Sequence, residues 1–304
     1  MSANLRGALF MCIAMASFTI NDTFVKWAME SLTLGQIVLL RGLMASTMLM
    51  LFIGRTINFQ QLSYLRHPAV LMRMIGEVGA TLFFMVALAH LPLAFVTSIL
   101  QALPLAVTLG AALFFSEPVG WRRWSAILVG FTGILIIVRP GFEGFSVWSL
   151  AILASVCCCA LRDLSTRAVP KELSTSTLSA MTALTVMLVG GLIIQPLGGW
   201  KPVTAPSLAL VFAASLCLIT GYHTLITAMR QGDISFIAPF RYTGLVWAIV
   251  LGFLVFGDTP DRYMLIGGAV IISSGLYSLH RERIVNRVRP IAGSTSPGMA
   301  PDGF

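Results

Sequence analysis

Charge is scarce in this chain. Only 11% of its 304 residues are Asp, Glu, Lys or Arg, whereas about 25% are charged in an average soluble domain. Hydrophobic residues make up 57%, which is more apolar surface than a water-soluble core can bury, so the composition indicates a lipid bilayer as the surrounding solvent. The net charge of +8 does not indicate a nucleic-acid partner, because the basic residues form no stripe on a polar fold.

Cysteine is also rare, and the common catalytic motifs are missing. The five cysteines lie inside apolar runs, with no metal-ligand spacing and no histidine beside them, which favours a packing role and predicts no metal site. There is no HExxH, no GxSxG, no P-loop and no GxGxxG after a strand. We therefore expect neither an enzyme nor a bound cofactor, and no ATP-driven transport by this chain alone.

Long apolar runs are what the sequence has in abundance. A helix needs about 20 mostly apolar residues to cross a bilayer, and continuous rather than alternating runs indicate helices rather than strands. The first run follows Arg6 as in a signal peptide, but it lacks a clean small-residue cleavage site, so we interpret it as an uncleaved span. The sequence predicts an all-α integral membrane protein with ten transmembrane helices, at residues 5–27, 34–54, 70–89, 94–116, 124–139, 147–167, 177–197, 207–228, 234–256 and 263–280.

The distribution of Lys and Arg predicts the orientation of these spans. With the N-terminus in the cytoplasm, twelve of the 20 basic residues fall on the cytoplasmic side, four fall outside and four lie within spans. Because basic loops stay in the cytoplasm, we expect both termini there. Residues 282–304 are basic and then rich in Gly, Ser and Pro, which predicts a disordered cytoplasmic tail.

The two halves of the chain match at one fixed shift. Asp163 minus Asp22 is 141, and Arg167 minus Lys26 is also 141. At the same shift, HLPLAFVTSILQALPLAVTLGAALFFSEP lies over QGDISFIAPFRYTGLVWAIVLGFLVFGDT without a gap. Chance can match apolar letters, but it is much less expected to match two charged pairs as well. The predicted five-helix repeats are residues 1–141 and 142–281.

An odd number of spans in each repeat inverts the second copy in the membrane. The small residues Ala126 and Gly133, two helical turns apart, lie over Gly267 and Ser274 at the same shift. Inverted repeats are a common architecture of secondary transporters. The two Asp-x-x-x-basic motifs are then pseudo-symmetric copies near opposite faces of the membrane.

Several segments together resemble a known family. They are NDTFVK at 21–26, LRG at 40–42, the long segment from 87 to 141 that contains HLPLAFVTSILQALPLAV, and the weaker second copy ending in FGDTPDRYMLIGGAVIISSG. Nearly the whole chain is similar to the drug/metabolite transporter superfamily, in its ten-helix EamA-type branch. Within that branch, GEVGATLFF at 76–84, RDLSTR and GWRRW most resemble the riboflavin importers.

The resemblance implies a carrier that works by alternating access. Its two halves would rock about a midplane cavity built from spans one, three, four, six, eight and nine. Riboflavin uptake is the function that the subgroup implies, whereas related members move S-adenosylmethionine, amino acids or other metabolites in either direction. A small-molecule substrate and the lipid bilayer are the expected partners, and a homodimer is left open.

The Asp-x-x-x-basic motifs need an explanation inside a membrane. A charge at the membrane centre costs about 2.5–3.5 kcal/mol on insertion scales, so each needs a partner or a role. Asp22 and Lys26, like Asp163 and Arg167, share a helical face with the acid first, which suits an ion pair four residues apart. Two interpretations stay open: the pairs fix the depth or contacts of a helix end, or they gate the outward-open and inward-open states.

Glu77 is the acid most open to a functional interpretation. It follows Arg73 by four residues, so an ion pair within one helix is one alternative. The other is that Glu77 faces the cavity and carries a proton or meets a polar substrate. Arg41 and Arg241 each lie seven residues inside a span. Either could pair with Glu77 or Asp163, or bind an anionic or carbonyl group of the substrate.

Prolines inside two spans mark further candidates. Pro104 and Pro239 either kink their helices or line the substrate site. Aromatic rings near them and in neighbouring spans could stack on a planar cargo, and polar side chains could bind its edge, although each aromatic alone could face lipid or pack between helices. His223 alone favours polar packing over a proton relay. Besides Glu77, Arg241 and the prolines, the expected cavity residues are Phe83, Phe84, Gln101, Tyr222, His223, Phe240, Tyr242 and Trp247.

The alternative from a different class is a membrane-embedded enzyme or a non-transporting scaffold. An enzyme needs converging catalytic groups, whereas a carrier needs a sealed central pocket with a gate at each end. The predicted inverted repeat favours the carrier, because an enzyme does not require one.

Overall fold

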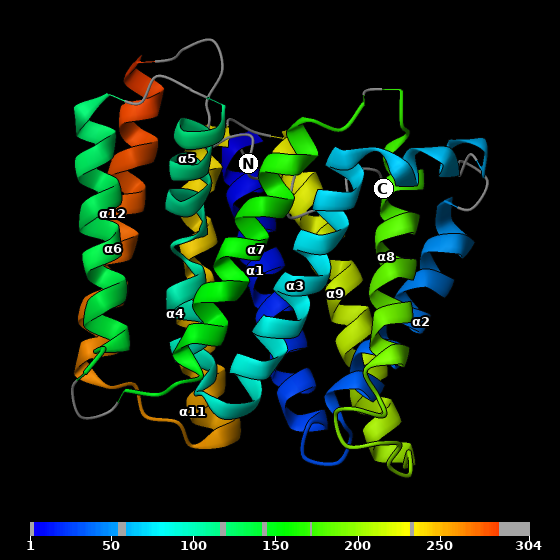
Figure 1. The fold of residues 1–304 in the computed structure, drawn as a ribbon. Helices are drawn as coiled ribbons and strands as arrows, with labels where there is room; N and C mark the ends of the chain where they lie inside the picture. The colour runs from blue at the N-terminus through cyan, green and yellow to red at the C-terminus, as the bar shows by residue number, and fades with distance from the viewer. Residues whose placement is uncertain are drawn as a thin grey trace.

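The computed structural model describes residues 3–53, 59–115, 120–141, 145–170, 172–231 and 234–285. Across these ranges every regular element is helical (Figure 1). The elements are α1 (Ala3–Ala28), α2 (Leu34–Ile53), η2 (Phe59–Arg66), α3 (Pro68–His90), α4 (Leu93–Leu100), α5 (Leu103–Phe114), α6 (Trp121–Val138), α7 (Ser149–Arg167), α8 (Thr175–Leu192), α9 (Ala205–Gln231), α10 (Ile234–Ile237), η3 (Ala238–Tyr242), α11 (Thr243–Phe256) and α12 (Arg262–Val285).

Most of these helices have the length and composition of membrane spans. Within the described ranges, eight helical stretches are long and apolar enough to cross a bilayer. Two shorter apolar helices, Leu34–Met48 and Thr177–Leu192, lie where the sequence predicts the second and seventh spans. The all-helical membrane fold is therefore confirmed, while ten crossings remain a prediction.

Two of the spans are interrupted where the sequence has proline. The stretch Leu93–Phe114 breaks between α4 and α5, and Pro104 lies in the first turn of α5. Pro239 lies in the first turn of the 3₁₀ helix η3, which precedes α11. Proline fits the first turn of a helix because its missing N–H would have no partner there. In both spans the proline therefore lies at the start of the helical segment that follows the break.

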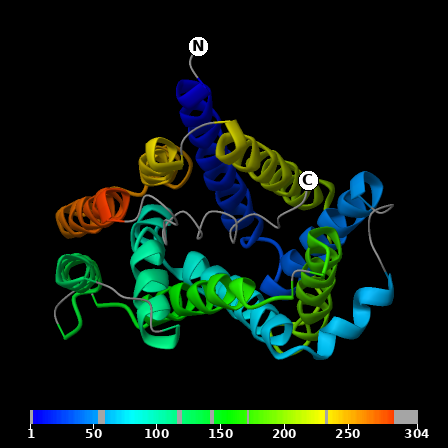
Figure 2. The same ribbon diagram turned by 90° about the horizontal axis from the view of Figure 1, so that it is seen from above.

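The closest helix pairs all join the first half of the chain to the second. α1 packs on α9, α3 on α7, α6 on α12 and α2 on α8. Viewed from above, α1, α9 and α11 lie along one side of the bundle, and α3, α4, α5 and α7 lie along the other (Figure 2). The two halves of the sequence are therefore interleaved, which does not fit the expectation that they move as two separate bodies.

Small residues bring α6 and α12 into close contact. A Cβ atom on Gly133 would lie 2.8 Å from the carbonyl oxygen of Gly267, and one on Gly267 would lie 2.6 Å from the carbonyl oxygen of Gly133. Two helical turns away from this contact on each helix, the Ser274 hydroxyl donates to the carbonyl of Ala126. Membrane helices associate through such small residues because the backbones can approach closely.

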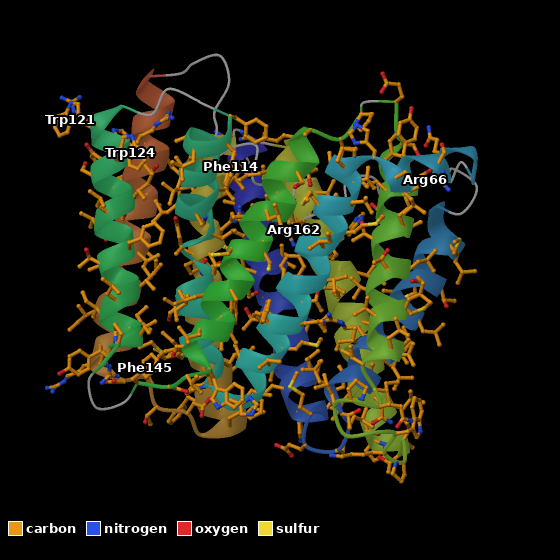
Figure 3. All side chains as sticks on the ribbon, in the orientation of Figure 1. Arg66, Phe114, Trp121, Trp124, Phe145 and Arg162 are labelled. Atoms are coloured by element: carbon orange, nitrogen blue, oxygen red, sulfur yellow. The ribbon has the colours of Figure 1, made fainter. Side chains whose placement is uncertain are left out.

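Both ends of the described chain lie at one face of the bundle. α1 starts and α12 ends at the top of Figure 1. Arg66 and Trp121 lie toward the same face, whereas Phe145 lies at the opposite face (Figure 3). α12 continues to Val285 and so includes the first four residues of the predicted tail, where Glu and Arg are good helix formers. The rest of that predicted tail lies outside the described residues.

Candidate functional site

A cavity of about 370 Å³ opens inside the bundle, within the size range of small-molecule sites. It lies between two layers of helices, one with α1, α9 and α11 and the other with α3, α4, α5 and α7. Both halves of the chain line it. The sequence predicts walls from spans one, three, four, six, eight and nine. Residues of α2 and α8, which correspond to predicted spans two and seven, line the cavity as well. Its main polar and aromatic lining residues are Phe18, Asn21, Asp22, Arg41, Arg73, Glu77, Thr81, Phe84, Gln101, Arg162, Ser179, Thr182, Tyr222, Arg241 and Tyr242.

Arg162 on α7 joins two carboxylates. Its Nε donates to Oδ1 of Asp163 at 2.8 Å, and its Nη1 lies 3.4 Å from Oε2 of Glu77 on α3. Arg162 lies within the bundle between α3 and α7 (Figure 3). Glu77 thus forms its ion pair with Arg162, which was not among the partners predicted from the sequence. Asp163 likewise pairs with its chain neighbour Arg162, whereas the motif predicts a pair with Arg167.

Asp22 on α1 occupies a different environment from its counterpart Asp163. It lies on the cavity wall, where Nδ2 of Asn21 donates to its Oδ1 at 2.9 Å. It interacts electrostatically with Arg41, which enters the same cavity from α2. The predicted partner Lys26 instead pairs with Asp258, so the ion pair within one helix is not formed.

Lys26 forms a contact between the two layers at the face opposite the N-terminus. Its Nζ lies 3.6 Å from Oδ2 of Asp258, in the connection between α11 and α12. The same ammonium donates to the carbonyl of Leu91, before α4, at 2.8 Å and lies 4.9 Å from the ring centre of Phe256. α1 is therefore tied to both α4 and α11 at this face.

Aromatic rings and the broken spans complete the wall. Phe18 on α1 and Tyr222 on α9 meet edge to face, with ring centres 5.1 Å apart. Gln101, at the end of α4, and Tyr242, before α11, line the cavity at the two helix breaks. These groups offer stacking surfaces together with hydrogen-bonding groups for a small molecule.

The structure places eight of the predicted cavity and ion-pair residues on the wall, and eight away from it. On the wall are Asp22, Glu77, Phe84, Gln101, Pro104, Tyr222, Arg241 and Tyr242. Away from it are Lys26, Phe83, Asp163, Arg167, His223, Pro239, Phe240 and Trp247.

Helical geometry explains the cavity residues that were misplaced. Successive side chains on a helix point about 100° apart, and Phe83 and His223 point outward where their neighbours Phe84 and Tyr222 face the cavity. Both are exposed, as is Trp247. Phe240 packs instead in the apolar cluster around Met11. These residues and Pro239 therefore lie outside the lining of this cavity.

Sequence reasoning singled out Arg41 and Arg73 but left their locations open, and it gave Arg162 no role. All three lie on the cavity wall, and Arg73 donates from Nη1 to the Thr166 hydroxyl at 2.6 Å. Their common property is visible in the sequence: each is a charge inside a predicted span, which marks a functional candidate. Small polar residues on the wall, such as Ser179, are uncharged, so the sequence gives no signal that singles them out.

Comparison with known sequences assigns the family. A sequence model described as the EamA-like transporter family matches residues 5–139 and again residues 146–279. The chain belongs to this family. The predicted membership of the drug/metabolite transporter superfamily is thus confirmed.

Curated relatives of this EamA-family protein are transporters with different cargoes. The riboflavin transporter of Rhizobium johnstonii is 29% identical over 196 residues, which span 64% of each chain, or somewhat less than two thirds of that relative's length. The S-adenosylmethionine uptake transporter of Rickettsia bellii is 25% identical over 91% of this chain and 94% of its own. The pseudopaline exporter CntI of Pseudomonas aeruginosa is 26% identical over 88% of this chain and 93% of its own.

A solved crystal structure shares the overall fold of this EamA-family protein. It superposes with a TM-score of 0.59 at 17% identity, covering 92% of this chain and 99% of the other. The coarser functional predictions are confirmed: the protein is a small-metabolite transporter that spans a membrane several times, and not an enzyme.

Proposed function

We propose that this EamA-family protein carries its cargo across the bacterial inner membrane by alternating access, as a secondary or facilitated transporter. The observation that carries the proposal is the central cavity, which one chain encloses and both halves of the sequence line. The proposed mechanism therefore does not require the homodimer that the sequence left open.

Contacts between α6 and α12 support ten spans in two inverted repeats, residues 1–141 and 142–281. The shift of 141 residues relates Ala126 to Gly267 and Gly133 to Ser274. The hydrogen bond between Ser274 and Ala126 and the close contact between Gly133 and Gly267 therefore join equivalent positions of the two repeats. Both contacts are present. A pseudo-twofold axis in the membrane plane has this effect, as in other inverted-repeat carriers.

Equivalent positions of the two repeats also meet at the cavity. Gln101 and Tyr242 differ by 141 residues, as do Thr81 and Tyr222, and all four line the wall. A cavity centred on the pseudo-axis is what alternating access needs, because exchanging the conformations of the two repeats then opens the same site to the opposite face.

The bodies that move are the two layers of helices and not the two halves of the sequence. One layer contains α1, α9 and α11, and the other contains α3, α4, α5 and α7 (Figure 2). Each layer draws on both repeats, so a pseudo-symmetric exchange converts one layer into the other. The contact of Lys26 with Leu91 joins the layers at the face opposite the N-terminus, which supports a gating role for Lys26 with partners other than Asp22.

Riboflavin is the first cargo to test, because two curated relatives, from Rhizobium johnstonii and Vibrio cholerae, are riboflavin transporters. The measurement is labelled riboflavin uptake in a riboflavin-requiring bacterium without its own importer. We expect cells that make this chain to show saturable uptake that unlabelled riboflavin competes away. Equal uptake with and without the chain, with the protein verified in the membrane, would contradict riboflavin as cargo.

S-adenosylmethionine uptake and amino-acid or metabolite export are the second candidates. Four curated relatives are S-adenosylmethionine uptake transporters, and pseudopaline exporters also match. Labelled uptake and efflux assays with these compounds follow if riboflavin fails.

A further inference from the structure

Basic groups outnumber acidic groups around the cavity. Among the described residues, four arginines line the wall, at positions 41, 73, 162 and 241, together with the acids Asp22 and Glu77. Asp163 joins them from behind the wall through its 2.8 Å bond to Arg162. Four guanidinium groups thus face three carboxylates, an excess of one positive charge.

The acids are unevenly shared among the arginines. Arg162 contacts both Glu77 and Asp163, at 3.4 Å and 2.8 Å. Asp22 is the remaining acid among the described wall residues, and it interacts electrostatically with Arg41. A cargo that brings a negative charge of its own would improve the electrostatic balance of a site of low dielectric constant.

The repeat supplies an internal comparison for two of the arginines. The shift of 141 residues relates Arg41 to Thr182 and Arg241 to Leu100, and all four positions lie on the cavity wall. The same fold therefore accommodates a neutral side chain at each equivalent position. A charge inside a membrane that the fold does not require marks a functional group.

We propose that the cavity is selective for small organic carboxylates. Guanidinium groups bind carboxylates through paired, charge-assisted hydrogen bonds, and Arg41 and Arg241 are the groups assigned to this selection. The apolar part of the cargo lies against the rings of Phe84 and Tyr222, which line the same cavity. This inference rests on the proposed transport function and specifies the charge of the cargo.

The test uses two small aromatic probes that share a ring and nearly a shape but differ in charge, benzoate and benzamide. Binding is measured as the concentration-dependent rise in melting temperature of the purified full chain. We expect benzoate to bind at least about tenfold more tightly than benzamide, the effect of one charge-assisted hydrogen bond.

The chain itself suggests the variants. Arg41→Thr and Arg241→Leu install the residues found at the equivalent positions of the other repeat, and each should reduce benzoate binding to the level of benzamide. Arg41→Lys keeps the charge and should retain part of the preference, which also covers the case in which Arg41→Thr fails to fold. Arg122→Gln removes an exposed arginine next to Trp121, outside the cavity wall, and should leave the preference unchanged.

Equal binding of the two probes, no binding of benzoate, or a benzoate preference that survives both cavity substitutions would overturn the inference. The transport proposal fails separately, if proteoliposomes take up none of the candidate metabolites in a saturable way. Support for carboxylates would move the search for the cargo away from riboflavin, which is uncharged at neutral pH, and would leave the carrier mechanism in place.

Discussion

At the scale of single residues, Arg162 pairs with two acids inside the membrane, Glu77 and Asp163. Its side chain is 8% exposed and that of Asp163 is 1% exposed, so this is a buried and not a surface ion pair. Removing one partner of a buried pair leaves an uncompensated charge, whereas surface pairs contribute little. Arg162 therefore holds two acids, Glu77 and Asp163, that would otherwise repel each other across α3 and α7.

We expect Arg162→Ala to destabilise the protein by about 3–5 kcal/mol, the typical cost of breaking a buried ion pair. The measurement is thermal unfolding of the purified protein, with the amount inserted in the membrane as a second readout. Arg66→Ala, at an exposed position of η2, is the control and should change stability little. Equal melting temperatures for the two variants would contradict a structural role for the Arg162 cluster.

The sequence predicted which residues carry charge inside the membrane but not which ones pair. The spacing in NDTFVK and RDLSTR suggested pairs within one helix, and the structure gives Lys26 and Asp163 other partners. Asp258 and Leu91 reach Lys26 from segments far along the chain. Such contacts depend on which helices become neighbours, and local spacing contains no information about that.

At the scale of elements, the contact of Lys26 ties α1 to the beginning of α4. The side chains of Lys26 and Asp258 are 17% and 25% exposed, so solvent weakens their ion pair, and the hydrogen bond to Leu91 adds to it. A contact worth about 1 kcal/mol is strong enough to bias two conformations of similar energy and weak enough to break in each cycle.

We expect Lys26→Met to open the face opposite the N-terminus more often. In a chain without its five native cysteines, a cysteine in place of Thr97 on the cavity wall should react several-fold faster with a membrane-impermeant thiol reagent added from outside. Arg139→Met is the matched control, because it breaks the pair with Asp261 between α6 and the beginning of α12. Unchanged labelling in Lys26→Met would contradict the gating role.

The contact between α6 and α12 gives a second prediction for elements. Gly133→Ala places a methyl group 2.8 Å from a backbone oxygen, so the helices must separate, and we expect a loss of about 1–3 kcal/mol in stability. Gly120→Ala adds the same atom at the start of α6 with nothing within 4 Å and should be nearly neutral. Similar melting temperatures for both variants would show that the pair tolerates separation.

Helix positions were predictable because a bilayer fixes how long an apolar helix must be. Predicted spans such as 34–54 and 70–89 differ from α2 and α3 by at most two residues at each end. The side of each helix that faces the cavity was not predictable, as Phe83 and Phe84 illustrate. A membrane helix is apolar all round, so its sequence lacks the amphipathic pattern that marks the buried face of a soluble helix.

At the scale of the whole molecule, the shared face of the two chain ends fits an even number of crossings. α1 starts and α12 ends at the same face, where Arg66 also lies (Figures 1 and 3). Basic residues mark cytoplasmic loops, so this face is the predicted cytoplasmic one.

Orientation can be measured on intact cells. In the chain without native cysteines, we expect Ser146→Cys, between α6 and α7, to react with an impermeant thiol reagent from outside, and Ser63→Cys in η2 to react only after the cells are opened. A green fluorescent protein fused to the C-terminus should fluoresce, because it folds in the cytoplasm. The opposite labelling pattern would contradict the predicted topology.

The pairing of helices across the two halves has a consequence for biosynthesis. The ribosome delivers α6 to the membrane about 124 residues before α12 begins, so the glycine-rich side of α6 meets lipid or the insertion machinery in the meantime. α1, α2 and α3 likewise wait for partners that are not yet made. Assembly of the bundle is therefore a late event after insertion, and a gene split after codon 141 should restore uptake only when both fragments are made in one cell.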